Sequence, residues 1–234
     1  MKDDPTAKTD LSYGMSSLYK LLTDRQKEKF LSEAGAYKFN AGNDIYDISS
    51  RSRLLYCVQN GKVKEYMNLP GCERDQIIRV VGEGEYFGYR SYLAGENFST
   101  RAVAIGPCEV VAIPLECLGL LLKSNHEVAL MFIRMLATDL GHAHLKAISM
   151  TQKHLRGRLA ETLLHLNSTY GLEADGSTLS IYLSREDLAN MSNMSTSNAI
   201  RTLSALSSEH AIAIDGRKIK IIDEEMLRYI SKLG

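Results

Sequence analysis

The chain has 234 residues, 44% of them hydrophobic, which is enough for one large domain or two small ones with a packed core. Its 28 basic and 28 acidic residues cancel, so the overall charge neither indicates nor excludes nucleic acid, and only a local patch can do so. No apolar run approaches the ~20 residues of a membrane-spanning helix, and the polar segment 1–14 has no signal-peptide pattern. We therefore expect a cytoplasmic protein without membrane contact and with a flexible N-terminus over 1–14.

Cysteine spacing argues against the common metal sites. The four cysteines, Cys57, Cys72, Cys108 and Cys117, are scattered and form no C-x-x-C pair. Zinc and iron–sulfur sites are usually built on such close spacing. We expect reduced, buried thiols, no metal site and no iron–sulfur cluster.

The segment from about 36 to 114 has the pattern of many short strands. A short helical lead-in over 15–34 precedes it. Apolar residues then alternate in short runs interrupted by glycines, among them IIRVV and CEVVAI, which is typical of an antiparallel sandwich or roll. In LLYCVQNGKVKEYMN, the pair Asn60-Gly61 can adopt positive φ at both positions, which predicts a type I′ hairpin.

The segment 126–150 predicts a long helix with two apolar stripes. Val128, Met131, Phe132 and Met135 form one stripe, and Ile133, Leu136, Leu140, Ala143 and Ala147 form the other. A single stripe is enough to pack a helix on its own sheet. The second stripe predicts a dimer interface with a twin helix, and burial of the helix in one larger core is the alternative.

The segment SREDLANMSNMSTSNAIRTLSAL contains two helix starts in close succession. Ser184 with Asp187 forms a capping-box pattern, and Ser195 begins the second helix. Asn193 suits the left-handed turn between them. Such a pair predicts either an ordinary helical hairpin or a helix-turn-helix, in which Leu188, Met191, Leu203 and Leu206 face the core and Ala189 allows a close crossing.

A helix-turn-helix would present the start of its second helix to DNA. Thr196, Ser197 and Asn198 then lie in the exposed first turn of a recognition helix over about 195–207, where residues reach base edges of the major groove. Arg201 lies a turn further on and can bond guanine O6 and N7, while Ser195 and Thr196 can donate to phosphate. Ser184 and Lys218 complete the candidate DNA contacts. Lys218 belongs to AIAIDGRKIKIID, whose Asp215-Gly216 turn predicts a small basic hairpin beside that helix.

No enzyme motif is present. The stretch GEGEYFG has the spacing G-x-G-x-x-x-G, one residue longer than the dinucleotide fingerprint, and its glycines are interpreted as turn residues. No G-x-S-x-G, H-E-x-x-H or Walker sequence occurs, so we expect the chain not to be an enzyme.

The order of these parts resembles the Crp/Fnr family of bacterial transcription regulators. The resemblance is strongest in GEYFGYRSYLAGENFSTRAVAIGPCEVVAIP and LSREDLANMSNMSTSNAIRTLSAL. It implies an α+β fold with a cyclic-nucleotide-binding-like antiparallel β-roll that senses an effector (15–125), a dimerisation helix (126–150) and a C-terminal winged helix-turn-helix domain (151–234). It also implies a homodimer that binds a two-fold DNA operator, with RNA polymerase as a further partner. Thr196, Ser197 and Arg201 match DNA-reading positions, although many members carry Glu where Ser197 stands.

The same resemblance gives a candidate effector pocket and disfavours cyclic AMP. Members that bind cyclic AMP carry Gly-Glu-Leu and then Arg-Ser or Arg-Thr, where this chain has Gly88-Tyr89-Arg90 and Phe98-Ser99. A buried phosphate without a cation is unfavourable, so we expect another effector or none. Arg90 or Arg101 could restore a cation, although strand alternation argues against Arg101. The candidate pocket residues are Tyr89, Arg90, Ser91, Phe98, Ser99 and Thr100.

Two alternatives stay open at the level of sequence. Haem is one, although His142 and His144, two positions apart on a helix, face different sides. Iron–sulfur members carry clustered N-terminal cysteines, and none precedes Cys57. The other is a sensor or scaffold module that shares the roll but does not bind DNA.

Overall fold

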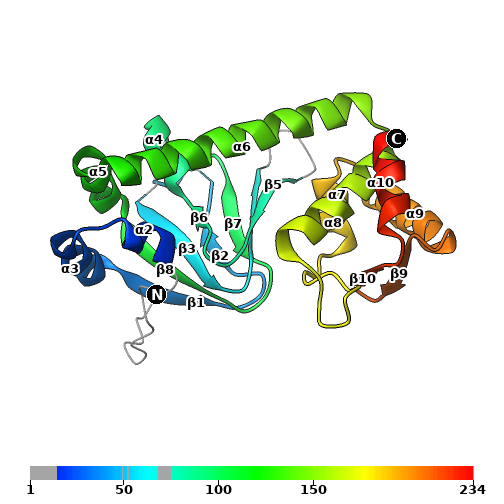
Figure 1. The fold of residues 1–234 in the computed structure, drawn as a ribbon, viewed down its shortest axis with the longest axis horizontal. Helices are drawn as coiled ribbons and strands as arrows, with labels where there is room; N and C mark the ends of the chain where they lie inside the picture. The colour runs from blue at the N-terminus through cyan, green and yellow to red at the C-terminus, as the bar shows by residue number, and fades with distance from the viewer. Residues whose placement is uncertain (1–14, 49, 52, 68–74, 234) are drawn as a thin grey trace. The chain divides into compact units, whose positions relative to one another are not determined.

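The computed structural model describes residues 15–48, 50–51, 53–67 and 75–233 (Figure 1). The described residues divide into two compact units, one within 15–67 and 78–138 and the other within 75–77 and 139–233. The predicted flexible segment 1–14 and Cys72 lie outside the described residues. In the part of the chain that the structure describes, no helix is both long and apolar enough to cross a membrane.

The first unit is built on two four-stranded sheets, and each described strand pairing is antiparallel. One sheet has the order β1 (Gly35–Phe39), β8 (Cys108–Pro114), β3 (Leu54–Asn60), β6 (Tyr86–Phe87). The other has the order β2 (Asp44–Tyr46), β7 (Arg101–Ala104), β4 (Val63–Met67), β5 (Gln76–Val81). The sequence prediction of an antiparallel sandwich or roll is therefore confirmed.

Strand β8 shows why the run CEVVAI is almost continuously apolar. Cys108, Val110 and Ala112 belong to one hydrophobic cluster together with residues of the second sheet, such as Val63 and Ala102. The alternate positions, Val111 and Ile113, belong to a second cluster that includes the helices. Because successive strand side chains point to opposite faces, a strand covered on both faces needs apolar residues at nearly every position.

The predicted hairpin at Asn60-Gly61 is wrong. Strands β3 and β4 flank this turn but belong to different sheets, so the chain changes sheet here. Gly61 has φ of +90°, and a Cβ at this position would lie 2.7 Å from the carbonyl oxygen of Pro107. Gly61 does adopt the positive φ that its residue type allows, but turn chemistry does not determine whether the flanking strands pair with each other.

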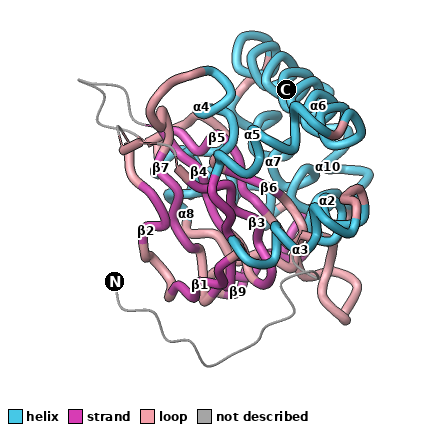
Figure 2. The backbone as a smooth tube through the Cα atoms, turned by 90° about the vertical axis from the view of Figure 1, so that its left-hand side faces the viewer, coloured by secondary structure: helices cyan, strands magenta, loops and turns pink. Residues whose placement is uncertain are grey.

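Helices cover the outer face of the first sheet. They are α2 (Ser16–Lys20), α3 (Asp24–Glu33), α4 (Tyr89–Ala94), α5 (Leu115–Ser124) and the first turns of α6 (His126–Gln152). In Figure 2, α2, α3 and α5 lie on the same side of the strands. Val128 and Phe132 of α6 are buried in the cluster beneath these helices, and Met131 and Met135 pack against it. The prediction that this stripe of α6 packs on its own sheet is confirmed.

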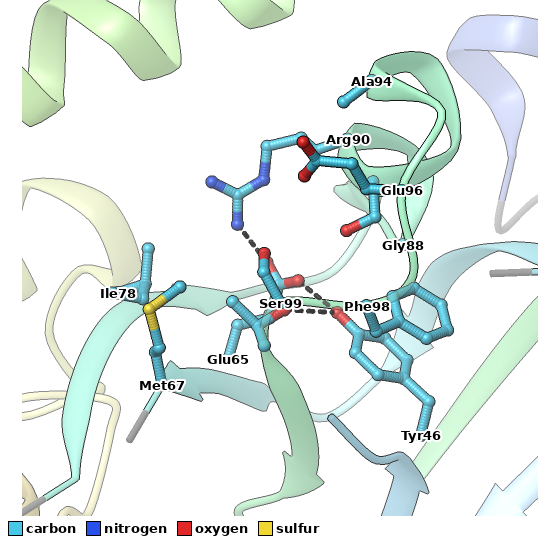
Figure 3. A pocket seen from close by; sticks show the side chains of 12 residues that line it. Tyr46, Glu65, Met67, Ile78, Gly88, Arg90, Ala94, Glu96, Phe98 and Ser99 are labelled. Carbon is cyan, nitrogen blue, oxygen red and sulfur yellow. Dashed lines mark hydrogen bonds and ion pairs between the residues drawn. The ribbon is translucent and has the colours of Figure 1, made fainter. Parts of the chain in front are cut away.

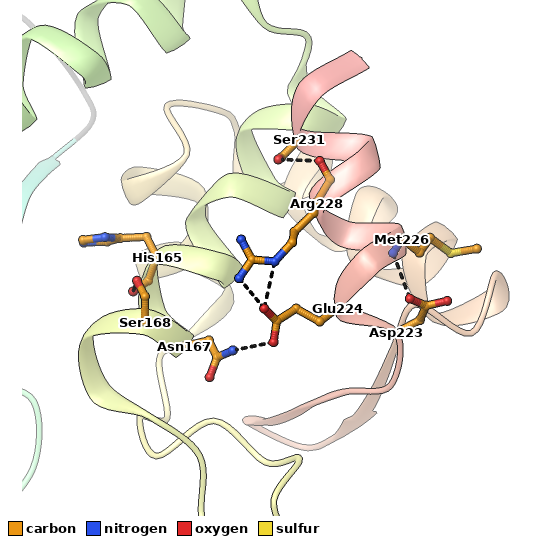
Figure 4. Close-up of polar contacts among 8 residues, drawn as sticks. All are labelled: His165, Asn167, Ser168, Asp223, Glu224, Met226, Arg228 and Ser231. Carbon is orange, nitrogen blue, oxygen red and sulfur yellow. Dashed lines mark hydrogen bonds and ion pairs between the residues drawn. The ribbon is translucent and has the colours of Figure 1, made fainter.

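The second unit contains the helix pair α8 and α9, a hairpin that follows it, and the two helices α7 and α10, which pack closely together. Its elements are α7 (Leu155–Tyr170), α8 (Arg185–Met191), α9 (Thr196–Ser208), β9 (Ile212–Asp215), β10 (Lys218–Ile221) and α10 (Glu224–Leu233). Figure 4 shows a hydrogen bond that fixes α10 to α7: Glu224 of α10 accepts it from Asn167 Nδ2 of α7 at 3.1 Å. Glu224 also accepts a hydrogen bond within α10, from Arg228 Nε at 2.9 Å. Asp223 accepts the Met226 N–H at 2.8 Å and so caps the start of α10.

Candidate DNA-binding surface and effector pocket

The first helix of the pair begins with the predicted capping box. Ser184 Oγ accepts the Asp187 N–H at 3.0 Å, and Asp187 Oδ2 accepts the Ser184 N–H at 3.3 Å and the Ser184 hydroxyl at 2.8 Å. This exchange satisfies N–H groups that the first helical turn leaves without partners. The Ser184 side chain is thus committed to starting α8.

Replacing Ser184 by Ala is expected to lower the free energy of unfolding of the second unit by about 1 kcal/mol, because it removes this cap. Chemical denaturation monitored by circular dichroism measures the loss. Ser184→Thr keeps the hydroxyl and is the control that should retain most of the stability. Equal stability of the alanine variant and the parent would show that the cap contributes nothing.

The turn between α8 and α9 has the geometry of a helix-turn-helix. Asn193 has φ of +49°, the left-handed conformation predicted for it. Ala189 is fully buried, which lets the helices cross closely. Leu188, Leu203 and Leu206 are buried as predicted. Met191 is only half-buried, which corrects its assignment to the core, and the buried methionine is Met194.

A buried serine near this turn is accounted for by hydrogen bonding. Ser192 is 3% exposed, and its hydroxyl donates to Thr162 Oγ1 at 2.9 Å, while the Thr162 hydroxyl donates to the Arg158 carbonyl at 2.9 Å. The polar groups are thereby satisfied within the core, where an unpaired hydroxyl would be destabilising. Arg158 also donates to the carbonyls of Met150 and Asn193, at 3.2 and 3.0 Å, so it joins the end of α6 to the turn.

Helix α9 presents an exposed polar face at its N-terminal end. Thr196, Ser197 and Arg201 are exposed, and Asn198 is half-buried. Ser195 Oγ accepts the Asn198 N–H at 3.2 Å and so starts the helix. Arg201 Nη2 donates to Asn198 Oδ1 at 2.5 Å, which holds the guanidinium over the first turn. The structure thus gathers these predicted residues at the start of one helix.

Sequence reasoning missed an apolar member of this face. Ile200 is 49% exposed, although it lies between the buried Ala199 and the exposed Arg201. Helical spacing of three and four residues places it on the same face as Ser197 and Ser204. The helical pattern of the segment, in which Ala199, Leu203 and Leu206 point inward, could have identified Ile200 as an exposed aliphatic side chain.

The predicted basic hairpin forms, but nearby carboxylates pair with its lysines. Strands β9 and β10 pair in register across the Asp215-Gly216 turn, and Arg185 Nη2 donates to the Gly216 carbonyl at 2.6 Å. Lys218 Nζ lies 3.8 Å from a carboxylate oxygen of Glu173, and Lys220 Nζ lies 3.3 Å from one of Asp175. The pKa of Asp175 is held well below its usual range, first by the Thr178 hydroxyl and then by backbone N–H groups. Lys218 therefore carries a partner of its own before any DNA contact.

The outward face of α6 is a row of large aliphatic side chains. Leu130, Ile133, Leu140, Leu145 and Ile148 are each at least 40% exposed. Of the residues predicted for a dimer interface, Ile133, Leu140, Ala143 and Ala147 are exposed, whereas Leu136 packs partly against the core of the first unit. Two further residues of the row were not predicted. Leu130 lies three residues before Ile133, and Ile148 lies eight residues after Leu140, and both are exposed on the same helix.

The first unit contains a cavity of about 170 Å³ at the predicted effector site (Figure 3). Five predicted residues line it: Arg90, Ser91, Phe98, Ser99 and Thr100. Further lining residues, which sequence reasoning did not identify, include Tyr46, Glu65, Met67, Ile78 and Glu96. Arg101 instead pairs with Asp44, with two N–O distances of 2.6 Å, as strand alternation predicts.

Tyr89 does not line this cavity, which corrects its assignment. The side chain is 1% exposed, and its ring packs edge-on against Phe132 of α6 at 5.2 Å between centroids. The residue that stands where the resemblance has a ligand-binding Glu is thus a core residue. Tyr89 is the first residue of α4, and its ring packs against α6, because a large aromatic ring gains more from burial there than at a polar pocket.

A buried carboxylate that pairs with two arginines lines the cavity. Glu65 is 2% exposed and accepts a hydrogen bond from the Tyr46 hydroxyl. Arg79 Nε lies 3.1 Å and Arg90 Nη2 lies 3.7 Å from Glu65 Oε2. Burial, followed by the charge of Glu65, holds the pKa of Tyr46 well above its usual value, so the hydroxyl keeps its proton.

The other candidate reactive groups do not gather into a site. Burial raises the pKa of the Cys57 thiol to about 12 and that of Cys108 to about 11, so both favour the unreactive thiol form. Among the residues that the structure describes, no group of three or more His, Cys, Asp and Glu side chains is placed to hold a metal ion. His142 and His144 are both exposed on α6, and the ring of His142 lies 6.5 Å from that of His165.

Fold and surface together are those of a DNA-binding regulator with a cyclic-nucleotide-binding-type β domain. A family model for the Crp-like helix-turn-helix domain matches residues 157–230, and one for the cyclic nucleotide-binding domain matches residues 37–125. The chain belongs to the Crp/Fnr family of transcription regulators. The family is not enzymatic, in agreement with the sequence prediction. The match to the DNA-binding domain decides against the alternative of a sensor or scaffold module without DNA binding.

Named relatives share this organisation along most of their length. The chain is 22% identical to the "cAMP-activated global transcriptional regulator CRP" of Pasteurella multocida over 199 residues, 85% of this chain and 95% of the relative. It is 28% identical to a "Global nitrogen regulator" of Nostoc over 187 residues, 78% and 83% of the two chains. The structure of FixK2 from Bradyrhizobium japonicum matches with a TM-score of 0.76 at 23% identity, covering 84% and 96%. These likenesses confirm the predicted α+β fold.

Proposed function

We propose that the protein is a homodimer that reads a two-fold operator with α9 and responds to a small effector, other than cyclic AMP, in the cavity of the β-roll. The observation that supports this most is the exposed N-terminal face of α9, where Thr196, Ser197 and Arg201 project from the protein. We also propose that it acts in the cytoplasm with RNA polymerase as a partner.

The start of α9 provides the chemistry for reading a major groove. Arg201 supplies a planar pair of donors that fits O6 and N7 of guanine, and Asn198 already holds it over the helix start. Ser195, Thr196 and Ser197 carry short hydroxyls that donate to phosphate or base edges, and the helix N-terminus attracts the phosphate charge. Ser184 contributes by starting α8. The ammonium group of Lys218 binds the phosphate backbone of the DNA in place of its ion pair with Glu173.

Helix α6 supplies the surface for a second copy of the chain. Its exposed row of Leu130, Ile133, Leu140, Leu145 and Ile148 is apolar and costs free energy in water. A twin helix covers such a row symmetrically, and Gly141, where an added Cβ would meet nothing within 4 Å, leaves room for close approach. Pairing of two subunits brings two recognition helices to half-sites about 34 Å apart.

The cavity of the β-roll is the proposed effector site. The relative from Pasteurella multocida is cAMP-activated by name, but here Phe98 and Tyr89 replace the charged residues that the family uses for cyclic AMP. A ligand in the cavity gates DNA binding by favouring one arrangement of the two units over another.

The salt dependence of duplex binding tests this function. Fluorescence anisotropy with a labelled duplex is expected to show affinity falling by roughly a thousandfold or more between 50 and 200 mM salt, as expected for six or more phosphate contacts through counterion release. An absence of retention on duplex at low salt, with the protein folded and dimeric, would contradict the proposal.

Ile200 is expected to read a thymine methyl group, since an exposed aliphatic side chain on this face matches apolar contact with that methyl. Replacing the contacted thymine by deoxyuridine should weaken binding by about 0.8 kcal/mol, roughly fourfold. Affinities of the parent and of Ile200→Ala are measured on both duplexes. The variant should be indifferent to the change, and equal sensitivity of both proteins would refute the contact.

A further inference from the structure

We propose that Glu65 acts as an internal anion of the effector pocket, so that the pocket excludes anionic effectors and admits a small molecule without net negative charge. This inference rests on the proposed effector role of the cavity. It names the chemical class of the effector and assigns Glu65 as the residue that determines it.

Strand alternation aims the Glu65 carboxylate inward. Glu65 and Val63 are both buried on β4, two residues apart and hence on the same face of the strand, whereas Lys64 between them is half-buried. Val63 faces the core between the two sheets. Glu65 takes the corresponding place at the cavity, and a carboxylate buried to this degree needs ionic and hydrogen-bonding partners.

The partners of Glu65 are the groups that an anionic ligand would need. Arg79 Nε lies 3.1 Å and Arg90 Nη2 lies 3.7 Å from the same carboxylate oxygen. Arg90 lines the cavity, and the ion pair between it and Glu65 is drawn in Figure 3. An anion that approached Arg90 would lie next to the Glu65 carboxylate and be repelled by it. The second lining carboxylate, on Glu96, is exposed, so water and salt screen its charge.

An aromatic pair fixes the carboxylate in place. Phe98 stands where the resemblance has a phosphate-binding arginine, and its ring stacks on Tyr46 at 3.8 Å with an angle of 7° between the planes. The Tyr46 hydroxyl donates to Glu65 and lies 3.2 Å from Thr100 Oγ1. Phe98, Tyr46 and Glu65 therefore form one connected unit. In this unit the Glu65 carboxylate supplies the negative charge that an anionic ligand would otherwise bring.

The remaining lining suits a small, uncharged ligand. Hydroxyls of Ser91, Ser99 and Thr100 offer hydrogen bonds beside the apolar side chains of Met67 and Ile78. The volume of about 170 Å³ is below the ~300–1,000 Å³ of pockets for drug-sized ligands. We infer an effector smaller than a mononucleotide.

Binding of anions to matched variants tests the inference. The purified parent is titrated with cyclic AMP and, separately, with inorganic phosphate, using calorimetry and thermal shift, and no binding is expected at millimolar concentration. Glu65→Gln removes the internal anion but keeps the side-chain shape, and it is expected to bind at least one of the two anions at least about tenfold more tightly than the parent. Glu96→Gln removes the same charge from an exposed lining residue that is not paired with Arg79 or Arg90, and, like the parent, it should show no binding at millimolar concentration.

A second variant covers the case in which Glu65→Gln does not fold. Glu65→Leu combined with Arg79→Met removes both the buried carboxylate and its half-buried partner, a change that proteins often tolerate, and leaves Arg90 to receive the anion. Submillimolar binding of cyclic AMP or phosphate by the parent, or no gain in whichever folded variant is measured, would overturn the inference. Duplex binding by the parent is measured in the same samples. If the parent does not bind duplex DNA, the proposed function is contradicted. The anion titrations are read without DNA and therefore test the inference separately.

Discussion

Leu140→Glu is expected to convert the dimer into monomers and to weaken operator binding roughly a hundredfold or more. Leu140 is 57% exposed in the single chain and lies in the aliphatic row of α6. Because Leu140 is already partly covered in the single chain, burying the rest contributes roughly 1–2 kcal/mol, and a symmetric dimer contains two such side chains. The substitution also places two carboxylates in an apolar interface, which costs further free energy. Sedimentation velocity at micromolar concentration measures the subunit association.

Leu120→Glu is the matched control for this prediction. Leu120 is 54% exposed on α5 and undergoes the same change from leucine to glutamate, but it does not belong to the aliphatic row of α6. The control should remain dimeric. A dimer of unchanged stability in Leu140→Glu would show that this face of α6 is not the interface.

Arg201→Ala is expected to cost roughly 1–3 kcal/mol of binding at each half-site and to relax the preference for one base pair there. The guanidinium is exposed over the first turn of α9, bonded to Asn198, so its loss leaves the core intact. Titration of operator duplexes that carry each of the four base pairs at the contacted position measures both effects. The parent should discriminate among the four, and the variant should not.

Arg228→Ala controls for the loss of a positive charge from the same unit. Arg228 lies on α10 and pairs with Glu224. Its removal should leave the base preference unchanged and alter affinity only slightly, because surface ion pairs contribute little. If Arg201→Ala kept the selectivity of the parent, the assignment of Arg201 to base reading would be wrong.

Features that depend on nearby residues were predictable from the sequence. The capping box of Ser184, the left-handed turn at Asn193 and the hairpin at Gly216 each depend on residues within a few positions of one another, and the structure contains all three. The apolar stripe with Val128 and Phe132 is equally local, because helical periodicity alone defines it.

Features that depend on contacts between distant segments were not predictable. Glu65 reaches the cavity opposite Arg90, which is 25 positions away, and no local pattern marks it as a pocket residue. Glu173, in the segment that follows α7, pairs with Lys218 of the hairpin, so a strand that looks basic in sequence is partly neutralised. At Gly61 the turn was identified but the change of sheet was not, because strand pairing depends on the whole roll.

Selection of binding sites from random duplex DNA by the purified, dimeric protein tests the central claim most directly, namely that the N-terminal end of α9 enters the major groove twice per dimer. The expected result is a two-fold symmetric site with half-sites about 10–10.5 base pairs apart from centre to centre, or a multiple of this spacing. Loss of this enrichment in Arg201→Ala is expected as well. Failure of the folded dimer to enrich any sequence, or enrichment of a site without two-fold symmetry, would contradict the account.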